Sequence, residues 1–332
     1  MAKKKTRKPS TRKGNKKKQV VDFIKQIIVT ACVVIVCFIA FWIGYEFIFP
    51  QDASSIGKKL ESVEKGAEKN SGYPDDLYAD TETDPANTDV PVISEPETIP
   101  FSMPDEVEMP RMESDRPEEI ITRESFAVSY NRTYRIPNWV AYELTAQEAG
   151  SNKSSRSNKF VPDPELDGTP DTRDYSRSGY DRGHMAPAGD MKWSHQAMKE
   201  SFYTSNICPQ DHYMNQGIWN DLENKCRVWA KKHKSVWVVT GPVISKKMKR
   251  IGDTGIGIPE AFFKVLMYST GTTLEGVAFV LENRNYEDSD LKKYAMPIDE
   301  AEKLTGIDFF HQLPDAVEDK MESELHLKKW GL

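Results

Sequence analysis

The longest apolar run in the chain lies near its N-terminus and gives the first prediction. Residues 27–43 are seventeen consecutive residues without a charge, and Thr30 is the only polar side chain among them. At ~1.5 Å per residue, about twenty such residues cross the ~30 Å core of a bilayer. Trp42, Tyr45 and Phe49 gather at the far end of the run, as an aromatic belt would. We therefore predict a transmembrane helix over residues 26–49.

A cleaved secretory signal is the alternative interpretation of this run. Its apolar core would be only about 7–15 residues long and would end at a small-x-small site. The run here is longer and bulky Trp42, Phe47 and Phe49 occupy its exit, so an uncleaved anchor is favoured. A single-pass protein would then keep the basic arm of residues 1–25 in the cytoplasm and the rest on the periplasmic or extracellular side.

Polar residues dominate the segment that follows the apolar run. Residues 50–125 are rich in Pro, Asp, Glu, Ser and Thr and poor in aromatic residues. Such a segment cannot bury enough apolar surface to offset its chain entropy. We expect a disordered tether, which its excess of acidic residues keeps extended.

Alternating and helical apolar patterns predict one globular domain over residues 126–332. The predicted strands are 126–130, 139–144, 235–240, 262–269 and 276–281, and Gly241-Pro242 is expected to end the third of them. The predicted helices are 194–202, 212–233 and a segment that begins at residue 298. Strands and helices mix without strict βαβ alternation, which favours an α+β fold with a mainly antiparallel sheet flanked by helices.

Charge separates the same three regions. The formal net charge of −6 combines +9 in residues 1–50, −13 in residues 51–125 and −2 in residues 126–332. A near-neutral domain lacks the overall basic footprint of a nucleic-acid binder, so that function would need locally clustered cations. Candidates for such a basic rim are Lys231, Lys232, Lys234, Lys246, Lys247, Lys249 and Arg250.

The cysteines of the domain do not identify a metal site or a definite disulfide. Cys208 and Cys226 are the two cysteines of the domain, and their separation permits a disulfide. Two buried free thiols are an equally open interpretation. No Cys/His array in the sequence has the spacing of a structural zinc site.

The densest group of reactive side chains lies in residues 180–190. Asp181-Arg182-Gly183-His184 combines a carboxylate, a guanidinium and an imidazole within four residues. Pro187 and two glycines rule out a continuous helix, so we place the motif at a strand end that runs into a tight loop. The imidazole can take a proton from water near neutral pH, and the arginine can hold an anion. The motif therefore suits chemistry on a phosphate.

A second polar group lies on the predicted helix 212–233. Asn215, Trp219, Glu223 and Arg227 recur every four residues, which puts them along one face. Amide and carboxylate oxygens are hard ligands suited to Mg²⁺. Spacing alone fits equally well a buried Trp219 beside an exposed Glu223–Arg227 ion pair.

The motifs together resemble those of the DNA/RNA non-specific endonucleases, the ββα-metal nucleases that include endonuclease G. The matching residues are Asp181-Arg182-Gly183-His184, Asn206-x-x-Pro209-Gln210 and Asn215-x-x-x-Trp219-x-x-x-Glu223. The likeness runs from about Phe126 to near Leu313, almost the whole domain. It implies a ββα-metal nuclease fold in a membrane-anchored, bacterial member of the family.

The resemblance implies a role for each motif residue. His184 would be the general base that deprotonates the attacking water. Asn215 would be the one direct protein ligand to a catalytic Mg²⁺, with Mn²⁺ as an alternative ion, and Glu223 would hold metal-bound water. Charge stabilisation is assigned to Arg156 and Arg227, and loop shaping to Asp181 and Arg182. Asn206 would orient active-site groups and Gln210 would lie near the substrate path, so both are expected among the substrate-binding residues.

The resulting hypothesis is an Mg²⁺-dependent endonuclease with little preference between DNA and RNA, which leaves 5′-phosphate ends by a one-metal mechanism. Its partners would be both nucleic acids and a membrane, and a homodimer is an open option. One alternative is an inactive nuclease-like module that binds nucleic acid at the cell envelope. Intact His184, Asn215 and Glu223 argue against it, since binding alone needs no base and no metal. Another alternative makes the basic arm the nucleic-acid contact.

Overall fold

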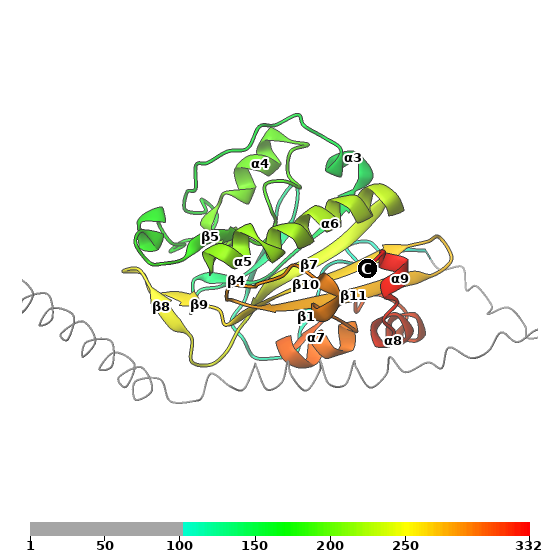
Figure 1. Cartoon of the computed structure of the whole chain (residues 1–332). Helices are drawn as coiled ribbons and strands as arrows, with labels where there is room; N and C mark the ends of the chain where they lie inside the picture. The colour runs from blue at the N-terminus through cyan, green and yellow to red at the C-terminus, as the bar shows by residue number, and fades with distance from the viewer. Residues whose placement is uncertain (1–101) are drawn as a thin grey trace, which may run out of the picture. The chain divides into compact units, whose positions relative to one another are not determined.

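A computed structural model of the chain describes residues 102–332, drawn in colour in Figure 1. The basic arm, the transmembrane helix and most of the tether that the sequence predicts lie outside the described residues. Within the described part, we find no helix that is both long and apolar enough to cross a membrane.

A seven-stranded sheet forms the centre of the domain, and every neighbouring pair of its strands is antiparallel. Its order is β12-β11-β10-β7-β4-β3-β2. The strands are β2 (Glu119–Thr122), β3 (Ala127–Asn131), β4 (Ile136–Thr145), β7 (Ser235–Val243), β10 (Ala261–Ser269), β11 (Leu274–Glu282) and β12 (Ala295–Met296). The prediction of a mixed fold with an antiparallel sheet is confirmed.

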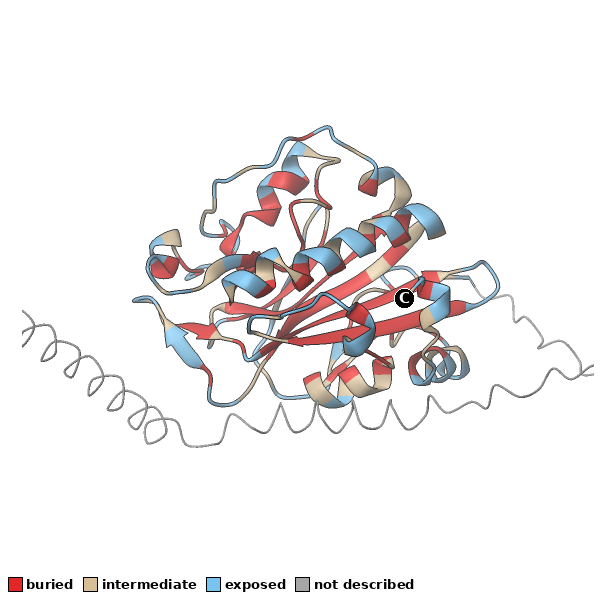
Figure 2. Ribbon diagram, viewed as in Figure 1, coloured by how far each residue is buried: buried red, intermediate tan, exposed pale blue. Residues whose placement is uncertain are grey.

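Helices cover both faces of this sheet (Figure 1). On one face lies α6 (Ile218–His233), and on the other lie α7 (Ile298–Thr305) and α8 (Asp315–Ser323). Two hydrophobic cores result, because successive residues of a strand point to opposite faces. On β10, Phe262 packs in the core under α6 and Phe263 in the core under α7. Figure 2 shows the buried strands between helices that are buried on their inner sides.

Shorter elements complete the fold. Three two-stranded ribbons pair β1 (Arg111–Met112) with β13 (Ile307–Asp308), β5 (Asp181–His184) with β6 (Ile207–Gln210), and β8 (Lys249–Ile251) with β9 (Ile256–Ile258). The remaining helices are α3 (Ala146–Ala149), α4 (His195–Ser201), α5 (His212–Gln216), α9 (Leu327–Trp330) and the 3-10 turns η2 (Thr172–Tyr175), η3 (Thr204–Asn206) and η4 (Leu291–Tyr294).

The folded domain begins before the predicted boundary at residue 126. Strand β2 pairs with β3 at the edge of the main sheet, and Val107 is buried in the core under α7. Residues 103–125, which the sequence assigned to the tether, therefore belong to the domain. The four-residue edge strand in this acidic, proline-rich segment could not be predicted, because an edge strand buries too few side chains to give a clear alternation of apolar and polar residues.

Two predicted element boundaries are also wrong. Strand β7 continues through Gly241-Pro242, because beyond Thr240 it has β10 as a neighbour but no longer β4, and an edge position tolerates a proline. The predicted helix 212–233 is broken at Gly217 into α5 and α6. A Cβ at Gly217 would lie 2.6 Å from the carbonyl oxygen of Tyr213, so the break requires glycine.

Candidate active site

The β5–β6 ribbon carries the Asp-Arg-Gly-His motif. In its register, Asp181 lies opposite Gln210 and His184 opposite Ile207. Asn206 precedes β6 and holds the loop that follows His184. Its side chain accepts a hydrogen bond from the Ala186 amide at 2.9 Å and donates to the Ala186 carbonyl at 2.9 Å. Asn206 therefore fixes the direction in which the loop leaves the motif.

Gln210 packs behind the motif rather than in front of it. A Cβ on Gly183 would come within 1.9 Å of Gln210 Oε1, so the motif glycine is needed to admit this side chain. Gln210 and Asn206 are fully buried, and neither is among the residues that line the cavity described below. Both covered side chains position the ribbon and its loop, and the predicted substrate contact of these two residues stays a prediction.

Helix α5 brings Asn215 against the motif. Asn215 Nδ2 donates to Asp181 Oδ2 at 2.9 Å, and His212 Nδ1 lies 3.1 Å from the same oxygen. The hydrogen bond to Asp181 uses the amide N–H group of Asn215. The carbonyl oxygen of that amide is the group that a hard cation takes as ligand. Asp181 thus orients Asn215, a role more specific than the predicted shaping of the loop.

A cavity of ≈ 490 Å³ collects most of the predicted site residues. Those that line it are Arg156, Asp181, Arg182, His184, Asn215, Glu223 and Arg227. Asn220 and Gln216 also line it and were missed by the sequence reasoning. Asn220 stands three residues before Glu223 on α6, so helical spacing could have found it. Residues from four separate stretches of the chain thus meet around one space.

His184 is the most enclosed of these side chains. It is 7% exposed, its ring meets Phe202 edge-on at 4.8 Å between centroids, and its Nε2 atom has no hydrogen-bond partner. An unpartnered buried nitrogen costs free energy and therefore suggests a functional reason. Burial, and then the charges of Arg156 and Arg182, lower the pKa of His184 to about 3. The imidazole is therefore neutral at physiological pH.

Both arginines rest on aromatic rings next to His184. The Arg182 guanidinium lies 4.4 Å from the Phe160 ring centroid, and that of Arg156 lies 5.4 Å from the Phe202 centroid. Both side chains are otherwise exposed. Stacking on a ring restrains an arginine while its donors stay available to an anion. Two cations thus stand at the mouth of the cavity.

A buried ion pair supports the opposite wall. Asp190 is fully buried and accepts hydrogen bonds from Arg227 Nη1 at 2.5 Å and from the Tyr142 hydroxyl at 2.9 Å. Arg227 is therefore paired with Asp190. The exposed Glu223–Arg227 ion pair, which helical spacing alone would also fit, is not formed. Asp190 closes the sequence motif but was not identified as a site residue, because its partner lies 37 positions away.

Lys264 is a buried cation that the sequence reasoning missed. It is 1% exposed on β10, and its Nζ lies 3.1 Å from Thr240 Oγ1 and 4.8 Å from the Trp219 ring centroid. Burial raises the pKa of Glu223 to about 7, and the Lys264 charge opposes that rise. The available signal was a single lysine within the otherwise apolar strand 261–269.

The donor set of the cavity fits a hard divalent cation. Asn215 offers a carbonyl oxygen and Glu223 a carboxylate, and both line the same space. Oxygen donors of this kind suit Mg²⁺, which keeps several of its waters when bound to protein. The described cysteines, Cys208 and Cys226, are buried free thiols and do not take part.

Comparison with known proteins agrees with this geometry. The model of the family described as DNA/RNA non-specific endonuclease matches residues 104–316. The chain is 35% identical over 221 residues to the mitochondrial nuclease of Saccharomyces cerevisiae, covering 59% of this chain and 67% of the relative. It is 36% identical over 205 residues to the mitochondrial nuclease EXOG of Homo sapiens, covering 56% of this chain and 55% of the relative.

A solved structure gives the same result. The crystal structure of the EndoG/EndoGI complex matches with a TM-score of 0.57 and 30% sequence identity, covering 60% of this chain and 89% of that chain. The chain spans little more than half the length of the human relative and about two thirds of the yeast one. The similarity thus concerns the folded domain.

Proposed function

Because this chain belongs to the DNA/RNA non-specific endonuclease family, we propose that its folded domain hydrolyses phosphodiester bonds in both DNA and RNA. The observation that carries the proposal is the convergence of His184, Asn215 and Glu223 on one cavity. A module that only binds nucleic acid needs neither a general base nor a cation ligand. The enzyme is therefore favoured over the inactive binding module.

His184 is the proposed general base. Its neutral imidazole takes a proton from the attacking water, which then forms a bond to phosphorus while the bond to the 3′ oxygen breaks. The products are a 3′-hydroxyl and a 5′-phosphate. The two arginines that depress the pKa of His184 are also those that would hold the phosphate. A bound phosphate offsets their charge, so the base becomes stronger when substrate is present.

Asn215 would supply one carbonyl ligand to Mg²⁺, and Glu223 would hold water bound to that ion. Such a cation polarises a phosphate oxygen and stabilises the charge on the leaving 3′ oxygen. Asp181 keeps the Asn215 amide in place through the 2.9 Å hydrogen bond. Asn220, beside them on the cavity wall, is a further polar contact for solvent or phosphate.

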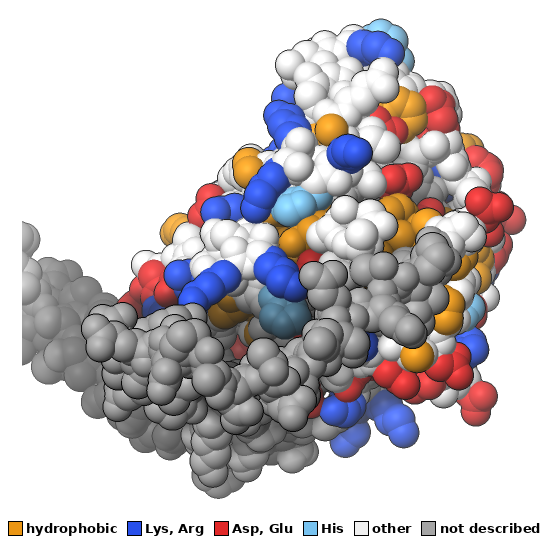
Figure 3. Space-filling model, turned by 90° about the vertical axis from the view of Figure 1, so that its right-hand side faces the viewer, with side chains coloured by type: hydrophobic (Ala, Val, Ile, Leu, Met, Phe, Trp, Pro, Cys, Tyr) orange, Lys and Arg blue, Asp and Glu red, His pale blue; other side chains and the backbone are white. Residues whose placement is uncertain are grey.

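Arginine contacts explain the expected lack of sequence preference. Arg156 and Arg182 stand exposed at the cavity mouth and are suited to bind phosphate oxygens, which carry no base information. Residues 126–332 have no overall positive charge. On the face drawn in Figure 3, Lys and Arg side chains are most frequent on the upper left and acidic side chains on the right, with further Lys or Arg side chains at the lower edge. Lys231, Lys232 and Lys234 belong to the predicted basic rim.

We also propose that the nuclease works at a membrane surface. Residues 26–49 have the length and composition of a membrane span, with basic residues before it. Fractionation of cells, followed by protease treatment of intact cells or spheroplasts, tests this arrangement. Release of the chain into the soluble fraction, or protection of its C-terminal domain together with cytoplasmic markers, would refute it.

The catalytic proposal is tested with the full chain, a supercoiled plasmid and an unstructured RNA. We expect both to be degraded with Mg²⁺, spared with excess EDTA and spared by the His184→Ala and Asn215→Ala variants. Product ends should accept a 5′-phosphate-dependent ligase. Retarded but intact plasmid in a gel shift would instead support the binding module. Undiminished cleavage by His184→Ala would contradict the assigned base.

A further inference from the structure

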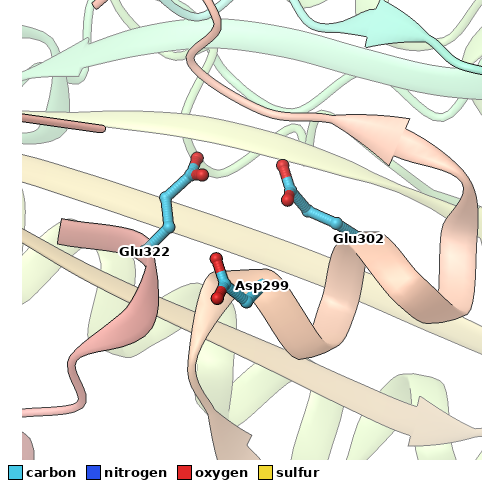
Figure 4. Close-up of side chains that lie close together, drawn as sticks. All are labelled: Asp299, Glu302 and Glu322. Carbon is cyan, nitrogen blue, oxygen red and sulfur yellow. The ribbon is translucent and has the colours of Figure 1, made fainter. Parts of the chain in front are cut away.

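A second group of carboxylates lies on the face of the sheet opposite α6. Asp299 and Glu302 come from α7, and Glu322 comes from α8. One ligand oxygen from each lies within 4.8 Å of the other two. Figure 4 shows the three side chains directed toward a common space between the two helices. Segments separated in sequence thus bring three negative groups together.

Glu322 lacks the contacts that normally stabilise a buried carboxylate. It is 5% exposed, and its Oε1 atom is covered and has no hydrogen-bond partner. Figure 4 shows this carboxylate directed into the group. Glu318, one turn earlier on α8, also has a covered Oε1 without a partner. Burying an unpaired charge is costly, so the arrangement requires a neutralising partner.

Two cations near the group are paired with other acids. Lys303 on α7 lies 2.8 Å from Glu300 Oε1, and Arg111 is ion-paired with Asp308 on the adjacent β1–β13 ribbon. Glu302 receives one hydrogen bond, from the Phe309 amide at 2.8 Å, which fixes its position without neutralising it. Asp308 acts on Glu318 as a further negative charge. Protons or a bound cation must therefore neutralise the buried carboxylates.

We propose that Asp299, Glu302 and Glu322 bind one divalent cation, Ca²⁺ in preference to Mg²⁺, which links α8 to α7. The three carboxylates lie close enough together to share one ion, since their ligand oxygens are all within 4.8 Å of one another. Their number favours Ca²⁺, which takes six to eight oxygen ligands, many of them from protein carboxylates. Mg²⁺ keeps several of its waters and is usually held by only one or two carboxylates.

This cation would be structural and independent of the nuclease centre. Helices α7 and α8 pack in the core on one face of the sheet, and the catalytic helix α6 packs in the core on the other. Glu302 is tied to the segment after α7 through Phe309, so the ion would join that segment, α7 and α8. Its removal should loosen the C-terminal part of the domain and leave the catalytic residues in place.

Calorimetry on the EDTA-treated full chain tests the proposal. The Asn215→Ala background removes the proposed catalytic ligand, so that binding elsewhere can be measured. We expect one Ca²⁺ per chain and a melting temperature that rises with Ca²⁺, since a ligand that binds only the folded state stabilises it. In the same background, Glu322→Gln should weaken Ca²⁺ binding at least tenfold and abolish the Ca²⁺-dependent rise in melting temperature. The matched control is Asp319→Asn, at an exposed acid on the same helix, which should keep both the Ca²⁺ affinity and the rise in melting temperature.

Three results would overturn the proposal. The first is no Ca²⁺ binding in the Asn215→Ala background, which would mean that shared protons neutralise the group. The second is equal weakening by Glu322→Gln and Asp319→Asn. The third is a preference for Mg²⁺ over Ca²⁺. If cation-free Glu322→Gln fails to fold, Asp299→Asn is measured in its place with the same expected loss. Plasmid cleavage with Mg²⁺ by Glu322→Gln in the otherwise unaltered chain should stay within about twofold of the parent, which separates this test from that of the nuclease.

Discussion

Replacing His184 with asparagine should slow catalysis by about 10²–10⁴ and, at the same time, make the domain more resistant to acid. Burial and two arginines lower the pKa of His184 from 6.5 to about 3 in the folded chain. Unfolding removes both causes and restores the ordinary pKa. Between pH 6.5 and about 3, the unfolded chain therefore binds a proton at His184, whereas the folded chain does not. The stability that depends on neutral His184 is present above pH 6.5 and is lost progressively as the pH falls toward 3.

The size of this effect follows from the pKa difference. The loss grows by ~1.4 kcal/mol for each pH unit below 6.5 and reaches about 2 kcal/mol at pH 5. Other groups also titrate over this range, but they do so equally in the parent and in the variant. The difference between the two proteins therefore isolates His184. The parent should lose about 2 kcal/mol more than His184→Asn between pH 7 and pH 5.

Urea unfolding of the full chain at pH 7 and pH 5, followed by tryptophan fluorescence, measures this difference. His195→Asn is the matched control, because His195 is exposed on α4. The rate of plasmid cleavage should fall by about 10²–10⁴ in His184→Asn and stay unchanged in the control. If all three proteins lose the same stability between pH 7 and pH 5, the depressed pKa is wrong. The argument for a base that is neutral before substrate binds would then be wrong with it.

Three further predictions concern charged residues of the cavity wall and those that pack behind it. Asp190→Asn should lower the free energy of unfolding in urea by about 3 kcal/mol, because Arg227 loses its buried partner. The control Asp221→Asn, at an exposed position, should lower it by less than ~0.5 kcal/mol. Equal losses in the two variants would contradict the ion pair. Lys264→Met should move the acidic limb of the pH–rate profile to higher pH, because this cation lowers the pKa of Glu223; an unmoved limb would exclude that coupling. Since the pKa of Glu223 is about 7, Mg²⁺ affinity measured by calorimetry should weaken as the pH falls from about 8 to 6, because a proton then occupies the carboxylate. Glu223→Gln should bind Mg²⁺ more weakly at pH 8 and lose the pH dependence, and a retained dependence would refute the assignment.

Local patterns in the sequence determined the main strands and the reactive motif. Strands β4, β7, β10 and β11 were predicted because alternation and β-branched composition are properties of neighbouring residues. The motif at Asp181–His184 was found for the same reason, since its groups are consecutive. Helical spacing also placed Asn215, Glu223 and Arg227 toward one space, although Gly217 interrupts the helix between them.

Packing across the fold sets which polar groups face the cavity and which lie behind it. Asn206 and Gln210 are as polar as Asn215, yet packing behind β5 covers them. Asp190 and Lys264 are single charged residues whose partners come from other elements. Ion pairing, burial and the resulting pKa shifts depend on distances across the fold, and residue spacing along the chain does not encode those distances. The sequence alone therefore determined which chemical groups were present, and the packing of α6 on the sheet decided which of them meet.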